Sequence, residues 1–398
     1  MSMQIVTSRG GGGSGKAVVT AKEGSTPHRT FQLTGWGIFV LFAVIIPYAL
    51  PNFRVTQFGQ AIAFGLMILG INLVIGYSGL LSIGHIAFAG TGAYITMILV
   101  NDNGWDYWMT WPVVVAACFA FGAILGLPAL KIKGLYLALV TLALAYTFPI
   151  LLKIDEWGIA TRTGGDNGRT ITEVLRPPGW ARSLFFLNGK NPQEQQAIYQ
   201  FICFFFTALV VFILVRNLIK SRPGRAIVTI RDNQIGSAVS GVNLSLYKVV
   251  TFGISAAVTG IGGSLLAINL ASVGPSSFDF RYAILTLMGL VLGGVATLHG
   301  NWIGGILLVF LQDLASRVEF TAIPFFKIER GSPLTQAVFG LVLVLVAFFA
   351  PGGIMSLAKR VKARFIKVIP NPPTEPPGQP VLADGTPSAE AELTPVAR

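Results

Sequence analysis

The chain has 398 residues, of which 53% are apolar and only 12% are charged. Soluble globular domains carry about 25% charged residues, so this composition excludes an ordinary soluble protein, and the wealth of apolar residues excludes disorder over most of the length. The net charge of +12 would indicate a nucleic-acid partner in a soluble protein, whereas in a membrane protein basic residues set the orientation of the chain. These numbers predict an all-α polytopic membrane protein without a nucleic-acid partner.

Residues 1–34 are polar and rich in glycine, and we expect them to form a flexible cytoplasmic N-terminus. Within them, residues 10–17 (GGGGSGKA) approach the phosphate-binding pattern G-x-x-x-x-G-K-[ST]. Ala17 stands where that pattern has a metal-binding hydroxyl, and no buried strand precedes the glycines. We therefore interpret this segment as a linker and not as a nucleotide site.

A membrane-spanning helix needs about 20 consecutive apolar residues. Several segments of the chain approach or exceed this length, and we expect about ten transmembrane helices, some of them broken or re-entrant. The segments are 35–50, 58–76, 81–100, 110–130, 134–152, 197–215, 249–268, 283–298, 301–316 and 334–350. Residues 35–50, 283–298 and 301–316 are the short ones, and the last two are also compatible with one broken hairpin.

The basic residues of the connecting segments predict the orientation. If the N-terminus is cytoplasmic, the segments on its side of the membrane hold 18 of the 29 Lys and Arg residues, and the opposite side holds 11. Because Lys and Arg favour the cytoplasmic side, we expect both termini there. The transmembrane domain then covers 35–356, with an extracytoplasmic loop at 153–196 and a cytoplasmic loop at 216–248. Residues 357–398 form a proline-rich cytoplasmic tail that we expect to be disordered.

Glycines and hydroxyl residues interrupt two neighbouring spans in residues 76–88 (GYSGLLSIGHIAF). Irregular backbone at membrane depth is tolerated only where protein or a water-filled cavity surrounds it. One interpretation is a translocation path, in which His85 offers a hydrogen bond to a substrate. The alternative is a tight turn followed by a packing histidine. The side chains that we assign to the path are Tyr77, Ser78, Ser82, His85, Thr91 and Tyr94.

The cytoplasmic loop 216–248 contains six basic residues and the pattern of two short amphipathic helices. In the first helix Ile227 and Ile230 share one face. Asp232 is suited to cap the start of the second helix, and Gly241 is suited to cap its end. Such helices either dock on a partner protein or lie on anionic lipid, and the pattern leaves both interpretations open.

The extracytoplasmic loop contains a run of turn-forming residues, which are Thr163, Gly164, Gly165, Asp166, Asn167 and Gly168. Glycine and Asx residues adopt the backbone conformations that tight turns need. The run is therefore either a plain turn or a functional motif of the outer loop.

Residue types suited to catalysis or metal binding do not cluster along the chain. Asp313 is the one formal charge inside the predicted spans, four residues before Arg317, where the two charges can meet at a helix end. Cys118 and Cys203 lie in apolar runs, and we expect them to pack as small apolar side chains without a disulfide. We therefore predict no catalytic residue, no metal site and no enzyme.

Five motifs follow one another in a recognisable order. They are 76–94 (GYSGLLSIGHIAFAGTGAY), 133–145 (KGLYLALVTLALA), 163–168 (TGGDNG), 223–252 and 350–353 (APGG). Together with the hydropathy pattern, they resemble the LivM-type permease subunits of branched-chain amino acid ABC importers over residues 58–356. In that family the loop matching 222–248 is the coupling loop, which docks on the ATPase subunit.

The resemblance implies roles for individual residues of this loop. Those expected to contact an ATPase subunit are Arg225, Ala226, Asp232, Asn233, Ala238 and Gly241. Gly236 and Ser237 stand where the family usually has alanines, and Gln234 stands where it commonly has an acid. The resemblance therefore implies the docking role more strongly than the individual contacts.

The resemblance also implies an assembly in the cytoplasmic (inner) membrane of a bacterium. A sister permease subunit would complete the path as a heterodimer, two ATP-binding subunits would hold ATP and Mg²⁺, and an extracytoplasmic binding protein would deliver the substrate. This chain would contact membrane lipid and bind no cofactor. Branched-chain amino acids are the expected substrates, with urea or a short amide as the alternative within the family. An ATP-independent channel or secondary transporter is the alternative from another class.

Overall fold

The computed structural model describes most of the chain between residues 45 and 317 and short stretches beyond. The described residues are 19–22, 45–132, 134–156, 158–171, 175–185, 187–317, 320–323, 326–328, 340, 348, 352–356 and 366–369. The glycine-rich segment 10–17, most of the first and last predicted spans and most of the proline-rich tail lie outside them.

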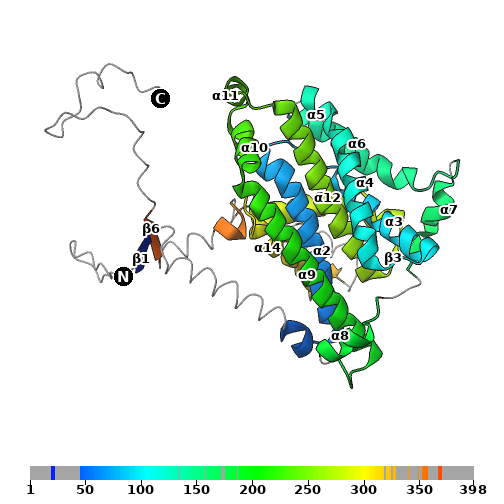
Figure 1. The fold of residues 1–398 in the computed structure, drawn as a ribbon. Coiled ribbons are helices and arrows are strands. Elements are labelled where there is room, and N and C mark those ends of the chain that lie inside the picture. Colours follow the sequence, from blue (N-terminus) through cyan, green and yellow to red (C-terminus); the bar gives the residue numbers. More distant parts are fainter. Residues whose placement is uncertain are drawn as a thin grey trace, which may run out of the picture. The chain divides into compact units, whose positions relative to one another are not determined.

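The chain divides into two units, one of residues 1–38 with 361–398 and one of residues 39–360. In the first unit, β1 (Val19–Lys22) pairs in parallel with β6 (Ile366–Ile369). The second unit is a bundle of helices (Figure 1).

Each predicted span between residues 58 and 316 coincides with a helix of the second unit. These helices are α2 (Asn52–Asn72), which continues as the π-helix η1 (Leu73–Tyr77), α3 (His85–Asn103), α4 (Tyr107–Gly126), α6 (Leu135–Leu151), α9 (Pro192–Lys220), α12 (Leu244–Leu270), α13 (Phe280–Gly293) and α14 (Gly300–Arg317). Within the described residues, four stretches are long and apolar enough to cross a membrane, namely Asn52–Tyr77, Tyr107–Lys131, Pro192–Lys220 and Leu244–Leu270. The apolar runs thus form the helices that the composition predicts.

Short elements connect the long helices. They are α5 (Pro128–Lys131), α7 (Ile159–Thr163), the 3-10 turn η2 (Gly165–Asn167), β2 (Arg169–Thr170), α8 (Gly179–Leu184), α10 (Arg222–Asp232), α11 (Gln234–Val239), β3 (Ser272–Val273), the 3-10 turn η3 (Pro275–Phe278), β4 (Phe320–Ile323) and β5 (Phe326–Ile328). β2 pairs with β3 and β4 pairs with β5, both antiparallel. Residues 45–49 are also helical.

α12 packs against α2, α3 and α4, and small residues bring these helices close together. A Cβ atom on Gly92 would collide with the carbonyl of Gly260, and one on Gly263 would collide with the carbonyl of Ala89. In lipid, such small residues let helix backbones approach and gain van der Waals contact. Buried Cys118 lies at the same contact, against Gly260, and is not bridged, as expected.

α13 and α14 pack against each other and are joined by residues 294–299. The backbone turns there through Gly294, with a φ of 112°, and Ala296, with a φ of 57°. The 14 residues of α13 reach about 21 Å at 1.5 Å per residue, less than the hydrocarbon core of about 30 Å. The predicted span 283–298 is therefore helical only to Gly293, because the backbone leaves the helix at Gly294.

The bundle has two ends, which we name after the elements found there. At the α10 end, α10 packs against η1 and α9, beside the start of α12 and away from α8 (Figure 1). At the β2 end, the strand pair β2–β3 follows the C-terminal end of α12, and Thr170 of β2 accepts a hydrogen bond from Asn101 near the end of α3. α2 begins at the β2 end and finishes at the α10 end.

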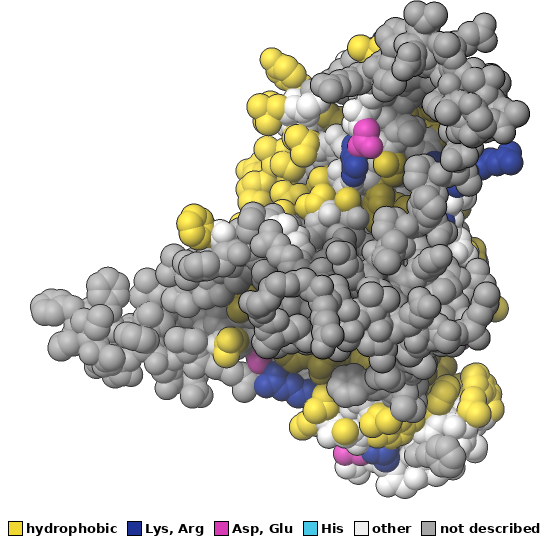
Figure 2. Space-filling view, turned by 90° about the vertical axis from the view of Figure 1, so that its left-hand side faces the viewer, with side chains coloured by type: hydrophobic (Ala, Val, Ile, Leu, Met, Phe, Trp, Pro, Cys, Tyr) yellow, Lys and Arg dark blue, Asp and Glu magenta, His cyan; other side chains and the backbone are white. Residues whose placement is uncertain are grey.

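Large apolar side chains remain exposed along α4, α6 and α9. They include Met109, Phe119, Ile124, Leu135, Tyr136, Tyr146, Phe206 and Leu214. Figure 2 shows hydrophobic side chains over much of the described surface of one face. Such extensive apolar surface is typical of helices that face lipid or a neighbouring membrane subunit.

Candidate functional site

His85, the first residue of α3, is fully buried and joins three parts of the bundle. Its Nδ1 lies 2.9 Å from Ser82 Oγ, and its Nε2 lies 2.6 Å from Ser255 Oγ on α12. Ser255 Oγ in turn donates to the carbonyl of Gly70 on α2 at 2.6 Å. Because the Ser255 proton is given to Gly70, Ser255 accepts from Nε2–H, and Nδ1 accepts from Ser82. One neutral tautomer therefore satisfies the whole chain of hydrogen bonds.

Two aromatic rings enclose the imidazole of His85. The ring centroids of Phe88 and Phe252 lie 5.3 Å and 5.8 Å from it. With both nitrogens bonded and the side chain fully buried, His85 packs α3 against α2 and α12 in this conformation. Its place in a translocation path stays a prediction, and it requires the hydrogen bonds to Ser82 and Ser255 to open.

The segment between η1 and α3 is irregular, as its glycines and hydroxyls predict. Residues 78–84 are not helical, and Ser78 and Ser82 are buried within them. The backbone N–H of Ile83 donates to Thr141 Oγ1 of α6 at 3.0 Å. Protein thus encloses part of this non-helical backbone, at Ser78 and Ser82, while Gly79 and Leu81 are exposed.

The remaining predicted path residues occupy separate places. Tyr77 is half-buried at the end of η1, and Thr91 Oγ1 donates to Ala87 O of its own helix at 2.8 Å. Tyr94 is 3% exposed, and its hydroxyl has no hydrogen-bond partner within the described part of the chain. The structure therefore brings Ser82 and His85 together but places Thr91 and Tyr94 further along α3. A buried hydroxyl without a protein partner commonly meets water or a ligand.

A second buried polar cluster, which the sequence motifs do not single out, surrounds Asn72 at the end of α2. Its Nδ2 donates to Thr297 O at 3.1 Å and to Asn301 Oδ1 at 2.9 Å, while its Oδ1 accepts from the N–H of Ala296 at 2.9 Å. The amide therefore holds the turn between α13 and α14 against α2. A signal for this cluster is present in the sequence, because a neutral polar residue inside an apolar span demands a partner.

The loop 216–248 folds into the two predicted helices, α10 and α11. Ile227 and Ile230 are both buried, which confirms the predicted apolar face of α10. The predicted cap at Asp232 is wrong: Asp232 ends α10, and Asn233 Oδ1 caps α11 by accepting from the N–H of Gly236 at 2.9 Å. Asn233 follows Asp232 directly and has the extended backbone that a cap needs. Gly241 has a φ of 79° just past α11, in the left-handed conformation expected after a helix.

α11 presents an apolar ridge to the surface. The side chains of Ile235 and Val239, one helical turn apart, are 79% and 86% exposed. Ala238 beside them is exposed as well, and so are Arg225 and Asn233, while Ala226 is half-buried. We call Ile235 and Val239 the α11 ridge. Two large apolar side chains so fully exposed on a six-residue helix are typical of a docking surface for a partner.

Arg231 connects α10 to the end of α2. Its Nη1 donates to the carbonyl of Gly76, in η1, at 2.7 Å, and its Nε donates to Asp232 at 2.9 Å. The side chain passes close to Gly79, where a Cβ atom would lie 2.6 Å from Arg231 Cγ. Gly79 has a φ of 70°, so glycine is needed there for its backbone and for space. The loop 216–248 and the interrupted span are therefore in direct contact.

The run Thr163–Gly168 forms a turn at the β2 end. Thr163 is buried and donates to the carbonyl of Leu152 at 2.7 Å. Gly164, Gly165 and Gly168 all have positive φ, and a Cβ atom on Gly168 would collide with the backbone of Val273 and Gly274. Asp166 forms an ion pair with Lys153, and Asn167 closes the 3-10 turn η2. The structure thus gives this run a role in joining the loops at the β2 end to one another.

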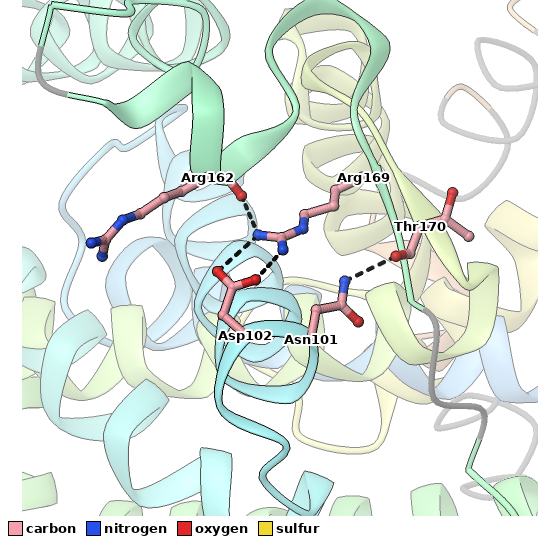
Figure 3. A network of polar contacts seen from close by, with 5 residues as sticks. All are labelled: Asn101, Asp102, Arg162, Arg169 and Thr170. Carbon is pink, nitrogen blue, oxygen red and sulfur yellow. Dashed lines mark hydrogen bonds and ion pairs between the residues drawn. The ribbon is translucent and has the colours of Figure 1, made fainter.

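Arg169, directly after this run, fastens the loop 153–196 to α3 (Figure 3). Its guanidinium makes a two-pronged contact with the carboxylate of Asp102, and Nη1 also donates to Arg162 O at 2.6 Å. The hydrogen bond from Arg169 lowers the pKa of Asp102 below its ordinary value, and the charges of Arg169 and Arg162 add to this effect. Asn101 Nδ2 donates to Thr170 O at 2.9 Å and completes the attachment.

A comparison with protein families identifies the chain. Residues 54–347 match the family described as branched-chain amino acid transport system, permease component. The chain belongs to this family. Its members are transmembrane permease components of ABC transport systems, so the predictions of a membrane permease and of a non-enzymatic subunit are confirmed.

Curated relatives of this permease cover most of its length. It is 27% identical over 357 residues to the high-affinity branched-chain amino acid transport system permease protein LivM of Salmonella typhimurium, with 86% of this chain and 79% of the relative covered. It is 26% identical to LivM of Escherichia coli, with the same shares covered. It is 25% identical to BraD of Pseudomonas aeruginosa, with 73% of this chain and 91% of the relative covered. A search of solved structures gives no significant match.

These matches confirm the resemblance seen in the sequence motifs. The permease is a multi-pass membrane protein with bacterial relatives. Within its described residues, no group of three His, Cys, Asp or Glu side chains is placed to hold a metal ion.

Proposed function

We propose that this permease is one of two membrane subunits of an ATP-driven importer in the bacterial cytoplasmic membrane, and that the importer carries branched-chain amino acids. The relatives from Salmonella typhimurium, Escherichia coli and Pseudomonas aeruginosa are named for high-affinity transport of these substrates. Among the described residues, buried polar side chains are nearly all uncharged, with Lys248 as the exception. Such an interior suits a substrate without net charge, and a zwitterionic amino acid is one.

We assign the α10 end to the cytoplasm and the β2 end to the outside. The six basic residues of 216–248 lie at the α10 end, and basic residues favour the cytoplasmic side. This orientation agrees with about ten spans and with both termini in the cytoplasm. It also makes 153–196 an extracytoplasmic loop, available to an external binding protein.

The α11 ridge is the observation that carries the importer assignment. A membrane-spanning path alone has no use for two exposed apolar side chains on a helix outside the spans, whereas a docking helix requires them. We therefore propose that α10 and α11 form the coupling loop and that the ridge enters a groove on an ATPase subunit, where ATP and Mg²⁺ are bound. Arg231, bonded to Gly76, then links this docking surface to the interrupted span.

Uptake into proteoliposomes tests the assignment. The complex of this chain with its sister permease, two ATPase subunits and binding protein should take up labelled leucine only when ATP is supplied. Labelled urea is the comparison substrate. If the complex takes up urea but not leucine, the importer belongs to the urea and amide branch of the family. Uptake by this chain alone without ATP would favour a channel or secondary transporter and would overturn the importer.

A further inference from the structure

A pocket of about 310 Å³ opens at the β2 end between α2, α12 and α14. Its lining residues are Phe53, Thr56, Gln57, Gln60, Asn269, Leu270, Val309, Gln312 and Asp313. The volume lies within the range of small-molecule sites, about 300–1,000 Å³. Amide and hydroxyl groups share the lining with three apolar side chains, so the pocket is suited to a small amphiphilic ligand and not to lipid alone.

One ion pair lies beside this pocket: Asp313 lines it, and its partner Arg54 is next in the chain to the lining residue Phe53 without lining the pocket itself. Arg54 Nη1 lies 2.9 Å from Asp313 Oδ2 and also donates to Gln57 Oε1 at 2.7 Å. The side chain of Arg54 is 30% exposed and that of Asp313 is 14% exposed, so both are partly withdrawn from solvent. The predicted meeting of Asp313 with Arg317 stays a prediction, because the side chain of Arg317 lies outside the described residues.

The helix ends around the pocket add charge of both signs. α2 starts at Asn52, so its positive N-terminal end lies on the side of Phe53 and Arg54. α12 and α14 finish here, at Leu270 and Arg317, so their negative C-terminal ends lie on the side of Asp313. The positive end of α2 and the negative ends of α12 and α14 therefore meet beside the pocket, where Arg54 and Asp313 are in contact.

We propose that this pocket is the outer substrate site of the permease and that it binds the zwitterionic backbone of an α-amino acid. The proposal deepens the proposed function and rests on it. The substrate carboxylate binds Arg54, its ammonium group binds Asp313, and Phe53, Leu270 and Val309 receive the aliphatic side chain. The substrate replaces one ion pair by two, so neither protein charge is left unpaired. Urea lacks both charges and cannot make this exchange.

Protection of an engineered cysteine tests occupancy directly. Thr56 lines the pocket and is exposed, whereas the native Cys118 and Cys203 are buried. In the purified complex without binding protein, Thr56→Cys should react with a maleimide, and saturating leucine should slow that reaction. Leucinamide, which lacks the carboxylate, and N-acetylleucine, which lacks the ammonium group, should protect far less. Adding Arg54→Gln to Thr56→Cys should abolish the protection by leucine.

Uptake kinetics test function. Arg54→Gln and Asp313→Asn should each raise the KM for leucine by about tenfold or more, the loss expected for one charged hydrogen bond. Gln60→Trp fills the pocket and leaves the ion pair in place, so it should also lower leucine uptake. The matched control is Asp106→Asn, which removes an exposed carboxylate just before α4, outside the pocket, and should leave the KM unchanged.

The outcomes separate the two proposals. Suppose that the wild-type complex imports leucine, that the Arg54 and Gln60 variants keep the wild-type KM for leucine, and that leucine does not protect Thr56→Cys from the maleimide. The pocket assignment is then wrong, and the importer assignment stands. If wild-type complex imports no leucine, both fall. If the Arg54 and Asp313 variants fail to assemble, Gln60→Trp and the protection of Thr56→Cys still decide the pocket.

Discussion

Single polar side chains hold distant parts of the bundle together. His85 connects α3 to α2 and α12 through two serines, and Asn72 connects α2 to the turn before α14. Each is buried among apolar residues, where an unpaired polar group costs about 1–3 kcal/mol. Their hydrogen bonds therefore specify which helices meet, in addition to the less specific apolar contacts.

Tyr94 differs from these residues, because its buried hydroxyl has no partner within the described chain. Tyr94→Phe removes that hydroxyl, and the melting temperature of the complex should stay the same or rise, since an unsatisfied group is lost. If the hydroxyl meets substrate in the path, the KM for leucine should rise about fivefold, the loss of one neutral hydrogen bond. Tyr136→Phe, at a tyrosine 75% exposed on α6, is the control. A lower melting temperature with unchanged uptake would assign the Tyr94 hydroxyl to structure.

Asp102 gives a prediction for pH. Its pKa is lowered in the folded protein from an ordinary value of 3.8, so its ion pair with Arg169 stabilises the fold above that value and is lost as the pH falls through the lowered pKa. At pH 7 and pH 5 the wild-type complex should therefore melt at a higher temperature than Asp102→Asn. At the acid limit, where Asp102 is protonated, the two should melt together. A difference that persists unchanged there would show that the carboxylate charge is not the cause.

The sequence predicts these residues to different degrees. Ser82 and His85 are three residues apart, so their proximity follows from the chain itself. Ser255 is 170 residues from His85, and no pattern within one helix indicates their contact. The ion pair of Arg54 with Asp313 could not be predicted for the same reason. The two residues are 259 positions apart in the chain, and only helix packing brings them together. The predicted cap of α11 is wrong by one residue because Asp232 and Asn233 are both good caps and the backbone decides between them.

At the scale of elements, the apolar runs predict the helices, because a segment within the membrane must satisfy its own backbone hydrogen bonds. The early end of α13 does not follow from the sequence. The apolar run continues through Ala296, whereas the backbone leaves the helix at Gly294. The conformation of Gly241 is predictable, because the residue after a helix often adopts a left-handed backbone that glycine alone adopts freely.

That glycine allows a matched test of the coupling loop. Gly241 and Gly104 both have positive φ, 79° and 64°, and a Cβ atom added at either residue would meet no other atom within 4 Å. Valine at either place costs about 1–2 kcal/mol of backbone strain, but Gly241 follows α11 and Gly104 follows α3. Gly241→Val should lower ATP-driven uptake about tenfold and weaken co-purification of the ATPase subunit. Gly104→Val, at the opposite end, should do neither; equal loss in both variants would remove the coupling-loop assignment.

At the scale of the whole molecule, the proposed functions lie at opposite ends of the bundle. The α11 ridge is at the α10 end, where we place the ATPase subunit, and the pocket beside Arg54 is at the β2 end, where we place substrate entry. The sequence predicts this division through its basic residues, which mark the cytoplasmic side. It does not predict the pocket, because three separate helices form it.

One helical stretch spans the distance between these ends. Residues Asn52–Tyr77 form a continuous run of 26 residues, about 39 Å long at 1.5 Å per residue. Arg54 lies in its first turn, and Arg231 of α10 grips the carbonyl of Gly76 in its last. If this stretch moves as one rigid body, a push along its axis at Gly76 displaces Arg54 by the same distance. A displacement of about 1.5 Å at Gly76 would then stretch the 2.9 Å contact between Arg54 and Asp313 beyond hydrogen-bonding range. A small movement of the docking helices would therefore suffice to change the contacts with a bound amino acid.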